Sequence, residues 1–146
     1  IIAGLSYLIH LFYKKYPLDK LAFVLHLGGL VGCVAALLSG DYADSNIVQT
    51  PAIHELIEEH EFLGQMTTYA FAMLAIWAFL RAKSNIQWER IVFVVVYIAA
   101  IGLLVIGAHH GGELVYEHGA GVKPMEPILE QQRNAVPEET STFDDD

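Results

Sequence analysis

Two long stretches without a charged side chain most constrain how this chain can fold. Residues 21–38 and residues 91–108 contain no Asp, Glu, Lys or Arg. Each stretch is about 18 residues long, which as a helix approaches the ~30 Å width of a bilayer's hydrocarbon core. Only 17% of all residues are charged, against about 25% in soluble domains. We therefore expect an all-α integral membrane protein.

Two further apolar segments complete a predicted four-helix bundle. Residues 1–13 are apolar but too short to span, and they suit the later part of a spanning helix whose start is missing. Thr50 followed by Pro51 is typical of a helix start, which predicts a helix running to about Arg81 with its first turns in water. The bundle should occupy residues 1–110. Its approximate spans are residues 1–13, 20–39, 60–81 and 88–110.

The basic residues predict how the bundle is oriented. Six of the 8 Lys and Arg residues fall in or beside two loops on one side: Lys14, Lys15, Lys20, Arg81, Lys83 and Arg90. Because basic loops stay on the cytoplasmic side, we expect a multi-pass protein of a bacterial inner membrane. Residues 111–146 should then form a Gly- and Pro-rich acidic tail in the periplasm, without regular helix.

The overall charge and the cysteine count exclude several classes of function. The chain carries 17 acidic and 8 basic residues, a net charge of -9, which argues against nucleic-acid binding. Its single cysteine, Cys33, provides neither a disulfide framework nor a thiolate cluster. No catalytic triad, phosphate loop or paired-cysteine motif is present, so an enzymatic activity is not specified. The expected partners are the lipid bilayer, neighbouring subunits and a basic extramembrane protein that contacts the tail.

Histidines near the acidic side are the strongest candidates for a binding site. His60 shares a helical face with Ile53, Ile57 and Gly64, which should point into the bundle. His54 falls on the opposite, charged face and should be solvated. His109 and His110 are predicted to end the fourth helix at the same depth as His60, and either one could face inward.

Three interpretations of these histidines stay open. His60 and His109 could fill both axial positions of a b-type haem iron, with Gly64 and Gly112 among the glycines that leave room for the macrocycle. The pair at the end of the helix could instead interact favourably with its dipole. A third alternative is a Zn or Cu ion held by a set of four residues. That set consists of His60, His109, His110 and Glu113.

Two more histidines lie inside apolar stretches. His10 and His26 would sit within the bilayer toward the basic side, where ionisable groups are costly and often functional. His26 is therefore included among the candidate cofactor-binding residues. The alternative for either residue is a neutral imidazole that is hydrogen-bonded to a neighbouring carbonyl.

The segment GGELVYEHGAGV, residues 111–122, closely resembles the terminal signature of a bacterial membrane family known as domain of unknown function 2231. The similarity includes the histidine and glycine pairs at residues 109–112 and the pattern His60-Glu61-Phe62-Leu63-Gly64. It covers about residues 5–122 and is weak before Thr50. The His-Pro motif that often begins this family is absent. The resemblance implies a four-helix membrane bundle associated with redox proteins, some relatives being fused to or encoded with cytochrome c domains, and it suggests b-type haem.

Two functions follow as predictions. The first is a small membrane subunit of a respiratory or photosynthetic electron-transfer complex that binds haem b between His60 and His109. Its partners would be other membrane and periplasmic subunits, including a cytochrome c. The alternative is a cofactor-free accessory subunit that stabilises a larger complex.

Overall fold

The computed structural model describes residues 1–13, 17–83 and 86–135, and it is all-α. Three of its helices are long and apolar enough to cross a membrane, as predicted: α2, α3 and α4. The helices and turns are α1 (Ile2–Phe12), α2 (Leu18–Asp44), α3 (Pro51–Leu80), η1 (Arg81–Lys83), α4 (Gln87–Tyr116), η2 (Lys123–Met125) and α5 (Glu126–Ala135). These features are consistent with a multi-pass membrane protein.

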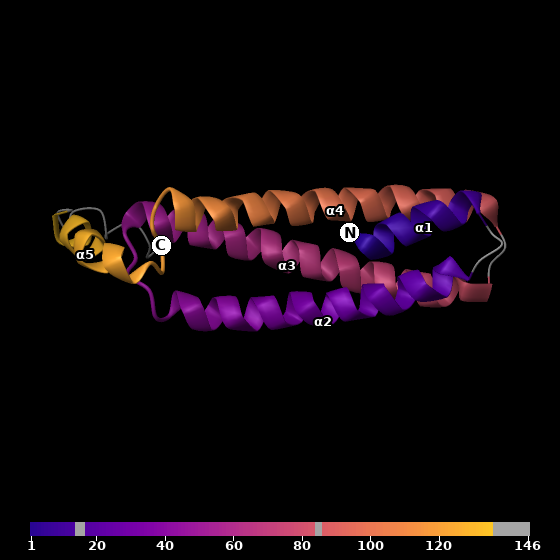
Figure 1. The fold of residues 1–146 in the computed structure, drawn as a ribbon, viewed down its shortest axis with the longest axis horizontal. Coiled ribbons are helices and arrows are strands. Elements are labelled where there is room, and N and C mark those ends of the chain that lie inside the picture. Colours follow the sequence, from indigo (N-terminus) through magenta and orange to yellow (C-terminus); the bar gives the residue numbers. More distant parts are fainter. Residues whose placement is uncertain (14–16, 84–85, 136–146) are drawn as a thin grey trace, which may run out of the picture.

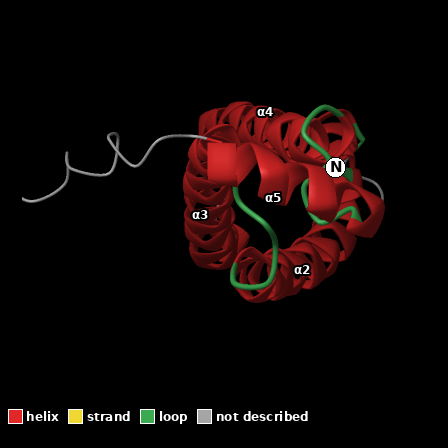
Figure 2. Ribbon diagram, turned by 90° about the vertical axis from the view of Figure 1, so that its left-hand side faces the viewer, coloured by secondary structure: helices red, strands yellow, loops and turns green. Residues whose placement is uncertain are grey.

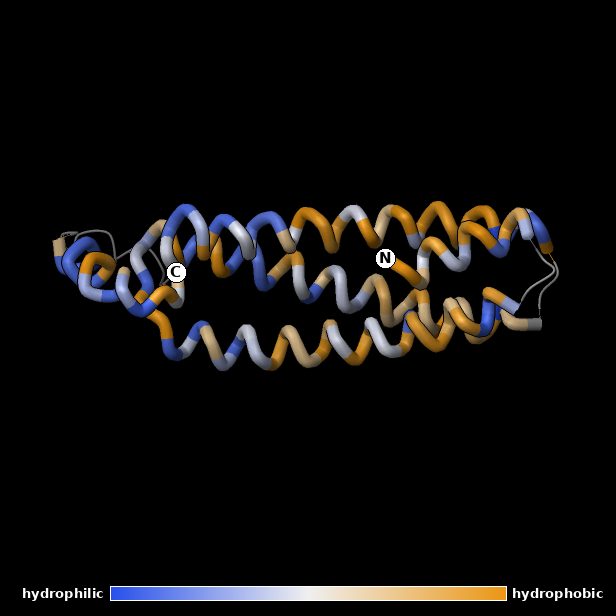
Figure 3. The backbone as a smooth tube through the Cα atoms, viewed as in Figure 1, coloured by the Kyte–Doolittle hydropathy of each residue, from blue (hydrophilic) through white to orange (hydrophobic). Residues whose placement is uncertain are grey.

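The first four helices form a ring in which each packs against the next, and α1 packs against α4 (Figure 1). The N-terminus lies about halfway along the bundle, so α1 accompanies its neighbours over one half only (Figure 1). We call the end of the bundle in the half that α1 reaches the basic end. It carries Lys20, Arg81 and Arg90. The opposite end, which carries Asp41 and the first turns of α3, is the acidic end. Hydrophobic residues dominate the basic half and the centre, while hydrophilic residues gather at the acidic end (Figure 3).

Aromatic rings fill the core of the basic half. Tyr7 of α1 meets Phe93 of α4 edge to face at 5.0 Å between ring centroids, and Tyr97 lies 5.4 Å from Tyr7. Such tilted contacts are the favoured geometry for aromatic pairs. A side chain at Gly4 would come within 2.8 Å of Ile101, so glycine lets α1 approach α4 closely. Small buried residues complete this core: Ala3, Ala22, Ala78 and Ala100.

The start of α3 confirms the predicted helix boundary. The side chain of Thr50 accepts a hydrogen bond from the backbone N–H of Ile53, and Pro51 occupies the first turn. A threonine oxygen at this position satisfies one of the backbone donors that a helix start leaves free. The helix runs to Leu80, one residue short of the expected end.

The structure corrects two other predictions. Helix α2 continues to Asp44, five residues beyond the predicted span of residues 20–39. Helix α4 passes through the expected end at residue 110 and stops at Tyr116, and the following turn uses Gly119 and Gly121 at positive φ. Gly111 and Gly112, which lie inside α4, cost only about 1 kcal/mol each in helix propensity, and helix packing outweighs this cost.

The predicted irregular tail contains a further helix that packs across the acidic end. Helix α5 lies over that end of the bundle (Figure 2). Its Leu129 is buried against α3 and α4 in a second apolar cluster. The tail prediction failed because Pro124 and Pro127 stand in first turns, where proline is tolerated, rather than inside a helix. The cluster consists of Ile53, Ile57, Leu114, Ala120 and Leu129. The acidic tail was expected to contact a basic partner protein. Its residues 136–146 lie outside the described residues.

Candidate functional site

His60 joins α3 to α4 by a hydrogen bond in the acidic half of the bundle. Its Nδ1 lies 2.9 Å from the backbone oxygen of Gly107. A carbonyl oxygen can only accept, so Nδ1 carries the proton and the neutral ring has its lone pair on Nε2. The inward-facing position predicted for His60 is confirmed, because Ile53 and Ile57 on the same face are buried.

Gly111 makes room for the His60 ring. A methyl group at position 111 would lie 2.8 Å from Cε1 of His60 and 3.3 Å from its Nδ1. Both distances are shorter than ordinary van der Waals contacts, so α4 needs glycine here for the ring to reach Gly107. The glycine pair that looked like a helix end in the sequence is therefore, at Gly111, a packing site inside a continuous helix.

His110, and not His109, turns toward α3. Nε2 of His110 lies 3.5 Å from a carboxylate oxygen of Glu59, and its Nδ1 lies 3.0 Å from the backbone oxygen of Ile106. His109 is exposed and does not border the cavity beside His60. The structure therefore does not bring His60 and His109 together as facing ligands. Adjacent residues on a helix point about 100° apart, so both histidines cannot face the same neighbour.

A cavity of about 390 Å³ opens beside His60 between α2, α3 and α4. His60, Gly64 and Gly107 border it, together with Cys33 on α2. Among the residues that the structure describes, His60 is the one histidine that borders it. Gly112 does not border it and is half-buried near Tyr116. The cavity lies in the half of the bundle that α1 does not reach.

These positions test the cofactors expected from the sequence. Nδ1 of His60 is bonded to the Gly107 carbonyl, and a carbonyl on one ring nitrogen is the usual way in which a histidine that binds metal through its other nitrogen is held. His109 does not border the cavity beside His60, so the described residues supply no second histidine there, and the haem site expected between His60 and His109 stays a prediction. Across residues 1–13, 17–83 and 86–135, no three His, Cys, Asp or Glu side chains come together for a metal ion. The Zn or Cu set with His110 and Glu113 is thus not assembled.

His26 makes a second hydrogen bond between helices, near the middle of the bundle. It is 2% exposed, and its Nε2 lies 3.0 Å from the backbone oxygen of Phe71 on α3. The ring also meets Tyr97 edge to face at 5.1 Å. This geometry matches the alternative expected from the sequence, in which a neutral imidazole bonds to a carbonyl. Interhelical bonds of this kind contribute roughly 0.6 kcal/mol each in membrane proteins.

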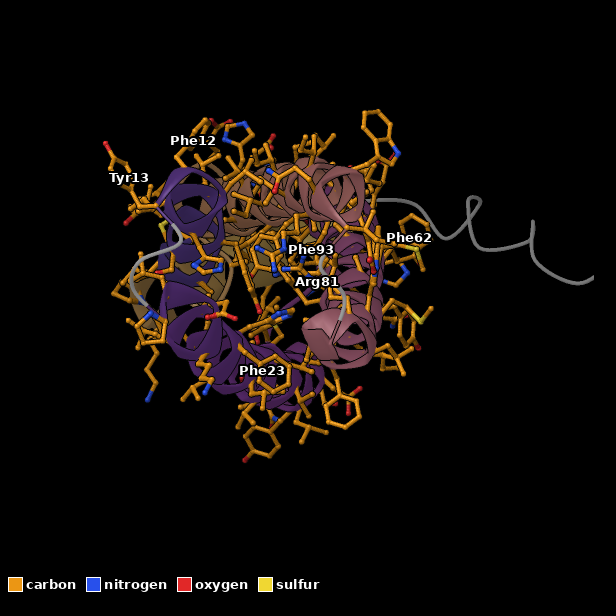
Figure 4. All side chains as sticks on the ribbon, turned by 90° about the vertical axis from the view of Figure 1, so that its right-hand side faces the viewer. Phe12, Tyr13, Phe23, Phe62, Arg81 and Phe93 are labelled. Atoms are coloured by element: carbon orange, nitrogen blue, oxygen red, sulfur yellow. The ribbon has the colours of Figure 1, made fainter. Side chains whose placement is uncertain are left out.

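Arg81 is a half-buried charged residue whose role the sequence did not reveal. Its guanidinium carbon lies 3.9 Å above the centre of the Phe93 ring and 5.6 Å from that of Tyr7. Figure 4, viewed from the basic end, shows Arg81 and Phe93 together inside the ring of helices. From the sequence, Arg81 only marked a basic loop. A signal existed, because an arginine that directly follows an apolar helix can bend back over its end.

No protein-family model, no curated protein and no solved structure matches this chain. The resemblance of residues 111–122 to the family named above therefore stays a prediction.

Proposed function

We propose that this protein is a non-catalytic subunit of a larger membrane complex and that its α2 packs against a helix of another subunit. The surface of α2 carries this proposal. Its buried residues are Ala22 and His26, whereas α3 has eight buried residues. Although α2 packs against α1 and α3, most of its side chains are therefore exposed.

Small residues recur every fourth position along that exposed surface. They are Gly28, Gly32, Ala36 and Gly40, and all four are exposed. A side chain at any of the three glycines would meet nothing within 4 Å. Small residues at this spacing let the backbones of two membrane helices approach closely, so an uncovered stripe of them supports a contact with another chain. Ala36 and Gly40 also line the cavity beside His60.

The cellular setting belongs to the same proposal. Basic residues at one end and acidic residues at the other support an inner-membrane protein whose acidic end faces the periplasm. The resemblance to a redox-associated family supports an electron-transfer complex as the parent assembly, with neighbouring membrane and periplasmic subunits as partners.

A matched pair of substitutions tests the α2 contact. Gly32→Leu should release the subunit from its complex, because a bulky side chain there separates the two helices. Gly102→Leu is the control, since Gly102 is equally open on α4 and gains the same helix propensity. Native gels of membranes solubilised in mild detergent would report the mass of the tagged protein.

The wild type and Gly102→Leu should migrate together as a large species, and Gly32→Leu should migrate near the mass of the single chain. Two differently tagged copies that co-purify would instead show that α2 packs against its own copy. If Gly32→Leu keeps the wild-type mass, α2 is not the contact and the proposal fails.

A b-type haem subunit is the second candidate, supported by the orientation of His60. Nδ1 of His60 donates to the Gly107 oxygen, so Nε2 of the neutral ring has the lone pair, and His60 borders a cavity that Gly64 and Gly107 also line. His60 would hold a haem there through Nε2, and the haem would supply a one-electron redox couple. A pyridine haemochrome assay on wild type, His60→Ala and His109→Ala tests this function. A b-type band that disappears in His60→Ala and survives in His109→Ala supports it, and a colourless, folded wild-type complex refutes it.

A further inference from the structure

A second cavity, of about 250 Å³, opens at the basic end of the bundle, whereas the cavity beside His60 lies in the acidic half. It lies between α1, α2, the end of α3, η1 and α4. Tyr7, His10, Lys20, Arg81 and Arg90 are among the residues that border it. This cavity plays no part in the function proposed above.

Buried polar atoms without a partner concentrate around this cavity. Within the described residues, four buried side-chain nitrogen or oxygen atoms lack a hydrogen-bond partner. Three of them belong to residues that border the cavity: the Tyr7 hydroxyl, Nδ1 of His10 and Nε of Arg81. A buried polar group without a partner costs roughly 1–3 kcal/mol, so such a cluster indicates a missing acceptor. All three atoms can donate a hydrogen bond, which defines the missing group as rich in oxygen.

The charges around the cavity specify an anion. Lys20, Arg81 and Arg90 border it, opposed by one acidic residue, Asp19. Neither ion pair in the described part of the chain involves any of these three basic residues. Burial lowers the pKa of Arg81, with Tyr7 and the nearby carboxylates acting in the opposite direction. An arginine nevertheless stays protonated at physiological pH. A desolvated, unpaired guanidinium is unfavourable until an anion binds it.

Arg81 is also held in a suitable orientation. Its guanidinium stacks over Phe93 at 3.9 Å, which covers a face of the planar group and leaves N–H bonds at its edge. Such an edge matches two oxygens of a phosphate group. The rest of the cavity wall is largely apolar, and two of its members, Val24 and Phe79, are 66% and 70% exposed on the outer surface of the bundle.

We propose that the basic-end cavity binds a phosphate group, with Arg81, Arg90 and Tyr7 as its main contacts. An acidic phospholipid headgroup and free phosphate share this chemistry. Basic pockets between helices on the cytoplasmic side of a membrane are typical sites for acidic lipid headgroups. The exposed apolar wall would continue along the acyl chains of such a lipid.

Native mass spectrometry of the full chain in detergent tests the proposal. The probes are phosphatidylglycerol, phosphatidylcholine of the same chain length, and inorganic phosphate. Tyr7→Phe removes only the hydroxyl, and Arg90→Gln removes a charge without disturbing the contact between Arg81 and Phe93. Arg133→Gln, on the exposed surface of α5 at the acidic end, is the charge-matched control.

Wild type and Arg133→Gln should prefer phosphatidylglycerol over phosphatidylcholine, and the two cavity variants should bind it about tenfold more weakly. Binding of inorganic phosphate that is lost in the same two variants would support the site with a free anion as its ligand. Equal binding of both lipids without binding of phosphate would overturn the proposal, as would an equal effect of all three substitutions. Under either result, water rather than an anion would accept the hydrogen bonds of Tyr7, His10 and Arg81.

Discussion

Replacing Gly111 by alanine is the sharpest test of how α3 and α4 fit together. In an exposed helix, exchanging Gly for Ala stabilises a protein by about 1 kcal/mol, because glycine has more backbone freedom to lose on folding. At position 111 the new methyl group would lie 2.8 Å from Cε1 of His60, so the ring must move. We therefore expect the sign of the effect to reverse.

The expected magnitude follows from the contacts that would be lost. Moving the ring breaks the 2.9 Å bond from Nδ1 of His60 to the Gly107 oxygen, worth about 1 kcal/mol. Crowding a packed contact costs a further 1–3 kcal/mol or so. After the gain in helix propensity is subtracted, Gly111→Ala should lower the free energy of unfolding by about 1–3 kcal/mol. Gly102→Ala, where a methyl group meets nothing within 4 Å, should raise it by up to about 1 kcal/mol.

Thermal and SDS-induced unfolding in detergent micelles, followed by circular dichroism, would measure both changes. The His60→Ala background provides a second check, because without the imidazole the alanine at 111 meets no ring and should stabilise the protein. A double-mutant cycle should therefore give a coupling of about 2 kcal/mol or more between the two positions. Equal stabilisation by Gly111→Ala and Gly102→Ala would show that His60 does not insert against α4, and the candidate site would have to be redrawn.

Three further outcomes are expected elsewhere in the bundle. His26→Leu loses the bond to the Phe71 oxygen and the ring contacts around it, so it should lower the free energy of unfolding by about 1–3 kcal/mol in the same micelle assay. Leu129→Ala removes the apolar anchor of α5; hydrogen exchange should accelerate in residues 126–135 while the amides of α3 keep their protection, and global unfolding would contradict this. Thr50→Ala removes the cap on the backbone N–H of Ile53 and should cost about 1 kcal/mol, whereas Thr50→Ser should retain most of the wild-type stability.

Features that depend on local chemistry could be predicted from the sequence. The long apolar runs identified the three candidate spans, and Thr50-Pro51 located the start of α3 because capping involves only neighbouring residues. The inward position of His60 followed from helical periodicity over a few turns. The same periodicity assigned His54 to the outer face, and that side chain is exposed in the structure, 3.3 Å from Glu58.

Features that depend on contacts between helices could not be predicted in this way. The glycines at 111 and 112 usually favour a helix end, yet the reason for Gly111 is the ring of a residue 51 positions earlier in the chain. Whether His109 or His110 faces α3 depends on the rotation of α4 about its axis, which its packing sets. The position of Arg81 depends on Tyr7 and Phe93, which belong to two other helices. Each of these misses concerns a tertiary contact. The local sequence indicates at most that Arg81 can bend back over its helix, and it does not identify the rings that Arg81 meets.

The length of α3 has a consequence for long-range electrostatics. Its 30 residues extend about 45 Å, whereas the hydrocarbon core measures about 30 Å and each headgroup layer adds roughly 5–8 Å. Placed across a bilayer with Leu80 at one boundary of the hydrocarbon core, α3 carries Glu55 roughly 8 Å beyond the opposite boundary. Glu55 and its acidic neighbours then lie at the outer, water-facing edge of the headgroup layer. The cluster of Ile53, Leu114 and Leu129 braces this projecting turn, so its negative field is held at a fixed height and extends into the water by about one Debye length at physiological ionic strength. An approaching cation-rich protein would sense that field before it touched the membrane, and raising the salt concentration would slow their encounter.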